Sequence, residues 1–179
     1  MTATFIFFIV EEFTSLVWTP RLGDAGVNLQ TLGLLFSISA LISIILPLII
    51  NKIQNNKKRN TVIVIVSLLF AILLFVAGFN ISLITLALIF IIMNVLESVV
   101  VPLDDSIFAS NVENTSLSAT IFSMRSAIVS IASIIGAPIA GFILDKYGFR
   151  SSYLIYSIFL VIIPMVYIIY FKKKVERIN

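Results

Sequence analysis

The sequence predicts an all-α membrane protein, a bundle of six transmembrane helices, and three observations support this. Six apolar stretches fill almost the whole 179-residue chain, and each is close to the ~20 residues that a helix needs to cross a bilayer. Apolar residues run all round each stretch, without the polar face of an amphipathic helix or the alternation of a barrel strand. The composition is 60% hydrophobic and 12% charged, with a mean hydropathy of +1.14, which is outside the usual range of soluble domains. We therefore expect one bundle over residues 1–179, with no separate extramembrane domain.

The predicted spans are, in chain order, Ala3–Thr19, Thr31–Ile50, Thr61–Gly78, Ile81–Val101, Ser118–Leu144 and Ser152–Phe171. The first has no basic segment before its apolar stretch, and Glu11–Glu12 interrupt it, so we expect a retained helix and not a cleaved signal peptide. Phe79–Asn80 allows only a tight hairpin, and residues 20–30 and 145–151 are predicted short loops. The longest connection, 102–117, divides the chain into two groups of three helices.

Histidine and cysteine are both absent from the sequence. Their absence excludes disulfides, haem and iron–sulfur ligation, thiolate or imidazole zinc sites, and acid–base catalysis by histidine. The net charge of +3 comes from basic residues at the ends of the spans and not on one polar face. We therefore predict no metal, no cofactor and no nucleic-acid partner, and a lipid bilayer as the surroundings.

The basic residues predict an orientation, because lysine and arginine favour the cytoplasmic side of short loops. One basic set lies in the connection 51–60 and the other follows Phe171; together they are Lys52, Lys57, Lys58, Arg59, Lys172, Lys173, Lys174 and Arg177. Six alternating spans place both segments on one side. The opposite side has the weaker set of Arg21, Lys146 and Arg150. We expect an integral protein of the cell membrane with both termini in the cytoplasm.

The two groups of three helices share a faint sequence repeat. Pro47-x-Ile49-x-Asn51-Lys52 follows the second span, and Gly141-x-Ile143-x-Asp145-Lys146 follows the fifth. The predicted orientation places them on opposite sides of the membrane, as an inverted repeat requires. The fold is therefore predicted as two three-helix inverted repeats.

Two carboxylates, Glu11 and Glu12, lie midway along the first span. Ionisable residues within a membrane are expensive, so they are candidates for function. Adjacent residues point about 100° apart on a helix, so at most one of the pair can face a given cavity squarely. In a low-dielectric site such a carboxylate could load and release a proton. The alternative is that the helix begins further upstream in a longer protein, which places both residues nearer an interface.

A second polar position lies late in the fourth span, where Asn94 precedes Glu97 by one turn on the same face. The pair could line a substrate path. Alternatively, Glu97 lies at the cytoplasmic interface, one turn before Pro102, and we favour this placement on the residues alone.

Arg125 lies two turns into the fifth span and needs a carboxylate partner there. Glu97 and Asp104 on the neighbouring helix are the nearest candidates. A structural ion pair between helices is favoured over ligand binding.

The fifth span ends in two rows of small residues at four-residue spacing. One row is Ala132, Gly136 and Ala140, and the other is Ser133, Ala137 and Gly141. Such rows allow the backbones of two helices to approach closely. They predict tight helix packing and identify no ligand.

Four segments carry motifs in a recognisable order. These are Trp18-Thr-Pro20 through Gly33; Pro47 to Arg59; Ser118-Ala119-Thr120-Ile-Phe-Ser123; and Gly136-Ala137-Pro138-Ile-Ala140-Gly141 leading to Asp145-Lys146-Tyr-Gly148-Phe-Arg150. Together they resemble the second half of the twelve-helix fold of the major facilitator superfamily. The second segment resembles that family's loop form Gly-x-Leu-x-Asp-Arg-x-Gly-Arg-Arg with Pro47 for glycine and Asn51 for aspartate, and Ser118 stands where some members have arginine.

The resemblance implies secondary transport of a small solute, and the intramembrane carboxylates make proton-coupled efflux the form considered. It also implies that the first and fourth spans line the central cavity. Glu11, Glu12, Asn94 and Glu97 are then the substrate or proton candidates, whereas Asp145 and Arg150 are structural. Arg125, Asp104, Asp145 and Arg150 form the set of ion-pair or gating candidates.

The resemblance covers six of the family's twelve helices, and alternating access needs two bundles that move against each other. We expect a fragment or a truncated reading frame, or else a half-transporter that pairs with a second six-helix half or with another copy. The competing function is a non-transporting membrane protein that acts as an assembly bundle. A membrane enzyme is disfavoured, because no nucleophile–base pair, metal set or phosphate-binding loop is visible.

Overall fold

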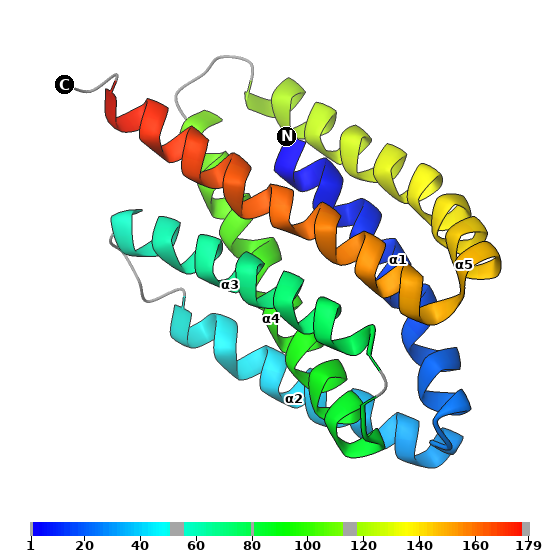
Figure 1. Cartoon of the computed structure of the whole chain (residues 1–179). Helices are drawn as coiled ribbons and strands as arrows, with labels where there is room; N and C mark the ends of the chain where they lie inside the picture. Colours follow the sequence, from blue (N-terminus) through cyan, green and yellow to red (C-terminus); the bar gives the residue numbers. More distant parts are fainter. Residues whose placement is uncertain (1, 51–55, 80, 113–117, 177–179) are drawn as a thin grey trace.

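The computed structural model describes residues 2–50, 56–79, 81–112 and 118–176, and over these ranges the chain forms helices and no strand. The elements are α1 (Thr2–Asp24), α2 (Leu29–Ile50), α3 (Asn56–Ala77), α4 (Leu83–Val112) and α5 (Ser118–Glu176) (Figure 1). All five are long and apolar enough to cross a membrane. The predicted all-α membrane fold is confirmed.

The described residues form five helical elements where six spans were predicted, because the fifth and sixth spans run on as one element, α5. Gly148 lies within α5 at φ 70° and ψ 177°, a conformation outside the helical region that glycine adopts without a Cβ clash. Two helices therefore meet there, and the chain reverses direction (Figure 1). We call 118–147 the first limb and 149–176 the second limb of α5. The predicted loop 145–151 is wrong, since this one glycine makes the reversal.

Two other predicted loops are largely helical. α1 continues through Pro20 to Asp24, so the connection to α2 shrinks to residues 25–28, where Gly26 has φ 93°. α4 continues through Pro102 to Val112, although the sequence placed a loop from residue 102. Proline removes one backbone donor, and helices packed among other helices tolerate that loss. Helical conformation does not mark where lipid begins, so the limits of the membrane spans stay predictions.

Some sequence predictions fall outside the described residues. These are the basic positions in 51–55 and 177–179, Asn80 of the hairpin, and residues 113–117 of the longest connection. The predicted inverted repeat and the loop motif after α2 include Asn51 and Lys52, so both stay predictions.

The helices pack as two units. α1 and α3 both pack chiefly on α5 and form the first unit, while α2 packs chiefly on α4 and forms the second. α3 also contacts α4 and joins the two units. The core of the first unit is aromatic: the ring of Phe13 stacks on Tyr156 at a centroid distance of 4.0 Å and meets Tyr153 edge-on at 5.5 Å. These rings are buried, and this burial holds α1 against the second limb.

One of the two small-residue rows packs against α1. Ala132, Gly136 and Ala140 are buried, and a Cβ added to Gly136 would lie 3.2 Å from the Cα of Ile9. The other row is less buried, and a Cβ added to Gly141 would have no atom within 4 Å. The first limb and α1 therefore pack closely at Gly136, where there is no room for a side chain.

The outer surface of the described bundle is strongly apolar. α2 is the least buried of the five helices, and its large aliphatic side chains Leu41, Ile44, Ile45 and Leu48 are all exposed. In water such a patch would cause aggregation, whereas in hydrocarbon it needs no cover. The burial pattern therefore agrees with the composition in requiring a lipid environment.

We predict that Gly136→Leu destabilises the bundle, whereas Gly141→Leu does not. Overpacking a close contact typically costs about 1–3 kcal/mol, because side chains and backbone must shift. Thermal unfolding of both purified variants in the same detergent, followed by circular dichroism, measures the difference. Equal melting temperatures for the two variants would contradict the described contact between the first limb and α1.

Candidate functional site

α1 and α4 run antiparallel and meet at three positions that are seven residues apart on each helix. At the first position, Thr4 Oγ1 donates a hydrogen bond to Asp104 Oδ2 at 2.9 Å. At the second, the carboxyls of Glu11 and Glu97 face each other. At the third, the rings of Trp18 and Phe90 meet edge-on with a centroid distance of 5.5 Å. Seven residues are nearly two helical turns, so the contacts follow one stripe on each helix with a spacing of about 10 Å. We call this stripe the α1–α4 seam.

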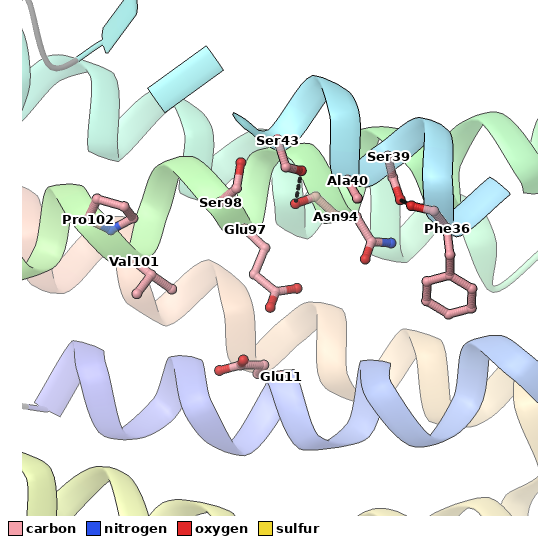
Figure 2. Close-up of a pocket in the computed structure, with 10 residues that line it drawn as sticks. All are labelled: Glu11, Phe36, Ser39, Ala40, Ser43, Asn94, Glu97, Ser98, Val101 and Pro102. Atoms are coloured by element: carbon pink, nitrogen blue, oxygen red, sulfur yellow. Dashed lines mark hydrogen bonds between the residues drawn. The ribbon is translucent and has the colours of Figure 1, made fainter. Parts of the chain in front are cut away.

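A cavity of about 470 Å³ lies beside the middle of the seam, between α1, α2 and α4 (Figure 2). Its lining combines two carboxyls, three serine hydroxyls, one amide and several apolar groups: Glu11, Phe36, Ser39, Ala40, Ser43, Asn94, Glu97, Ser98, Val101 and Pro102. Figure 2 shows Glu97 reaching from α4 toward α1, with Glu11 facing it. The volume is in the range of pockets that hold small molecules.

A second cavity of about 110 Å³ continues along the seam. It shares Asn94 and Glu97 with the larger cavity and extends to Trp18. Glu97 therefore borders both cavities, near the middle of α4. The interfacial position that we favoured from the residues alone stays a prediction, because helical conformation does not mark where lipid begins.

The Glu11 and Glu97 carboxyls face each other between α1 and α4 (Figure 2). Two ionised carboxylates offer only acceptors, so a hydrogen bond between them requires a proton on one of the two. The Oε2 atom of Glu11 is buried and has no hydrogen-bond partner among the described residues. A proton, or another positively charged donor, between the two carboxyls would satisfy both of them, and the predicted proton role of this pair stays a prediction.

The hydroxyl and amide groups around the cavity donate to backbone carbonyls. Ser39 Oγ donates to Phe36 O (2.9 Å), Ser43 Oγ to Asn94 O (3.5 Å), Ser98 Oγ to Val95 O (2.7 Å), and Asn94 Nδ2 to Phe90 O (2.8 Å). Since each hydroxyl has a single proton, the serines can present only oxygen lone pairs to the cavity. The polar lining is accordingly rich in acceptors.

An ionic cluster occupies one end of the seam. Asp104 accepts hydrogen bonds from Arg125 Nη2 at 2.7 Å and from the Tyr167 hydroxyl at 2.6 Å, besides the bond from Thr4. Arg125 Nη2 also pairs with Asp105 Oδ1 at 2.5 Å. The side chains of Arg125 and Asp104 are each only 14% exposed. This cluster joins α1, α4 and both limbs of α5, and the carboxylate that pairs with Arg125 is Asp104 and not Glu97.

Three of the eight candidate residues lie elsewhere. Glu12 points away from the larger cavity, with its Cβ 3.3 Å from the position of a Cβ on Gly136. Asp145 is exposed near the turn at Gly148. Arg150 is exposed too, and its guanidinium carbon lies 5.8 Å from the ring centroid of Phe79. The structure thus brings Glu11, Asn94 and Glu97 together, and Arg125 with Asp104, and their roles stay predictions.

Several site residues escaped the sequence analysis, namely Thr4, Phe36, Ser39, Ser43, Asp105 and Tyr167. The seven-residue spacing from Thr4 to Glu11, matched by that from Glu97 to Asp104, was a usable signal for two antiparallel stripes. No comparable signal marks the serines of α2, because that helix is apolar all round.

The family comparison agrees with the motifs. A family model described as Major Facilitator Superfamily matches residues 1–178. A search of curated proteins found no match.

We predict that Asp104→Asn lowers the stability of the bundle by about 3–5 kcal/mol, because it leaves the buried Arg125 charge poorly compensated. Asp105→Asn is the matched control, since the Asp105 side chain is 49% exposed and its loss leaves the Asp104 pair intact. Chemical unfolding in detergent, followed by the fluorescence of Trp18, compares the two variants. A smaller effect for Asp104→Asn than for Asp105→Asn would contradict the central place of Asp104 in the cluster.

Proposed function

The chain belongs to the major facilitator superfamily, a family of membrane transporters, and we propose that it moves a small solute across the membrane in exchange for protons, as an exporter. The cavity between α1, α2 and α4 is the proposed solute site. The observation that supports this proposal is that the carboxyls of Glu11 and Glu97 face each other at the border of that cavity, where a shared proton would relieve their repulsion.

The proton step follows from the surroundings of the pair. Glu12 is the neighbouring carboxyl on the same helix, and it points away from the larger cavity toward Gly136. The ionic cluster of Arg125, Asp104 and Asp105 lies two turns away along the seam. The described residues of α2 that line the cavity contribute hydroxyl groups and no charged group. A proton bound between Glu11 and Glu97 removes one buried negative charge, and its release restores that charge when the cavity opens to water.

Alternating access requires a second bundle, which we propose lies against the open side of the cavity. Transporters of this type work by rocking one bundle against another around a central site. Only α1, α2 and α4 line the larger cavity within the described residues, and α2 is the least buried helix. The second bundle could be another part of a longer protein or another copy of this chain.

The proposed location is the cell membrane, with the Asp104 end of the bundle in the cytoplasm. Lys58 and Arg59 at the start of α3 lie at this end, where Arg59 Nη1 donates to Ser106 Oγ at 2.7 Å. Lys172 lies in the last turns of the second limb, at the same end as Tyr167. The members Lys58, Arg59 and Lys172 of the larger basic set, which the structure describes, therefore lie at one end, which supports a cytoplasmic position.

We predict that Glu11→Gln and Glu97→Gln abolish proton-driven export. In proteoliposomes loaded with a mixture of small cellular solutes, an acidic exterior should cause the loss of at least one solute, detected by mass spectrometry. Either variant should reduce that loss to the level of protein-free liposomes, because the amide cannot release a proton. Glu12→Gln is the matched control and should retain export.

Unchanged export in both variants would overturn the proton step, and it would favour the alternative that the carboxyls serve packing or assembly. An independent readout is the infrared band of a protonated carboxyl in the purified protein. It should be present in the original chain and in Glu12→Gln, and absent in the double variant Glu11→Gln/Glu97→Gln.

We also predict that cysteines placed at Lys58 and Lys172 react with an impermeant maleimide from the cytoplasmic side only, and cysteines at Asp24 and Lys146 from the other side only. The chain has no cysteine of its own, so each variant carries a single label site. Intact cells and inverted vesicles provide the two orientations. Labelling of Lys58 and Lys172 positions from opposite faces would refute the proposed topology.

A further inference from the structure

We infer that the cavity beside the seam recognises an organic cation, specifically a protonated amine that carries an aromatic or aliphatic group. This inference rests on the proposed function, since it names the substrate class of the same site. Three features of the lining support it: its charge, its hydrogen-bonding character and its aromatic end.

The charge of the lining is negative. Glu11 and Glu97 both border the larger cavity, and none of the described residues that line either cavity is a lysine or an arginine. A carboxylate in such a low-dielectric site attracts a cation more strongly than in water and repels an anion to the same extent. An anionic solute would therefore be excluded, whereas an ammonium group would take the place of the shared proton.

The hydrogen-bonding groups of the lining also select a donor. The protons of Ser39, Ser43 and Ser98 are donated to backbone carbonyls, so these side chains accept hydrogen bonds from the cavity. Within the part of the chain that the structure describes, the buried Oε2 atom of Glu11 has no hydrogen-bond partner, and only a donor can satisfy it. An ammonium group has donors and no acceptor, which matches this lining. A solute rich in acceptors would leave the same oxygens unsatisfied.

The aromatic end of the lining suits an apolar group. Phe36 borders the larger cavity and meets the ring of Phe90 edge-on at 4.9 Å, and Trp18 borders the smaller one and meets Phe90 at 5.5 Å. These rings lie one seam interval from the carboxyl pair, about 10 Å along the helices. A cation with an apolar tail of comparable length would contact both ends at once.

The test uses three ligands with the same phenyl group and different charge: 4-phenylbutylammonium, 4-phenylbutanol and 4-phenylbutanoate. Binding to the purified full chain in detergent is followed by the fluorescence of Trp18, the only tryptophan of the sequence, and by calorimetry. The amine should bind at least about tenfold more tightly than the alcohol, as expected when a charged hydrogen bond is added, and the carboxylate should show no saturable binding.

The variants test which side chains are responsible. Glu97→Gln and Glu11→Gln should each weaken the binding of the amine at least about tenfold and leave the binding of the alcohol unchanged. Glu12→Gln should bind the amine like the original chain.

Equal binding of the three ligands, or tighter binding of the carboxylate, would overturn the inferred substrate class. The partitioning of a ligand into the detergent is the same for all protein variants, so it cannot produce the expected differences between variants. The order of the three ligands on the original chain also tests the inference without any substitution. If the chain exports other solutes in a proton-driven way and does not bind the amine selectively, the inferred substrate class is rejected and the proposed function stands. Selective binding of the amine without proton-driven export would reject the transport proposal alone.

Discussion

Polar side chains surrounded by lipid must find their partners on other helices, and the α1–α4 seam is where this bundle meets that requirement. Thr4 meets Asp104, and Glu11 meets Glu97, at equal spacing on two antiparallel helices. The match in spacing lets one helix orientation satisfy both polar pairs, and it places Trp18 against Phe90 at the third position. The cavity, the ionic cluster and the aromatic end all depend on this alignment.

Hydropathy predicted the general architecture, since only helices satisfy the backbone of apolar stretches of this length within lipid. The connections were less predictable. Asp145-Lys146-Tyr147-Gly148 has the composition of a loop, yet a single positive φ at Gly148 reverses the chain between two helices. Pro102 indicated a helix end, whereas α4 continues to Val112. At Gly148 the conformational freedom of glycine makes the reversal, whereas at Pro102 the packing of neighbouring helices outweighs the local preference of proline.

The candidate site was predictable where charge made a partner necessary. Arg125 required a carboxylate, and Asp104 supplies it; adjacent Glu11 and Glu12 could not share one cavity, and only Glu11 borders it. The contribution of α2 was not predictable, because a helix that is apolar all round gives no sign of which face meets α4. Tyr167 was missed for a related reason: a tyrosine near a helix end is ordinary at a membrane interface, and only the fold brings it to Asp104.

The division of the helices into two packing units has a mechanical consequence. Glu11 belongs to the unit of α1, α3 and α5, whereas Glu97 belongs to the unit of α2 and α4, although the two carboxyls face each other. In the proposed transport cycle, a proton between them links one group of helices to the other. Once it leaves, the two like charges repel each other, and unit charges about 4 Å apart repel by about 1–4 kcal/mol, depending on how far water enters. The proposed cycle thereby converts the chemical potential of a single ion into a force that pushes the two groups of helices apart.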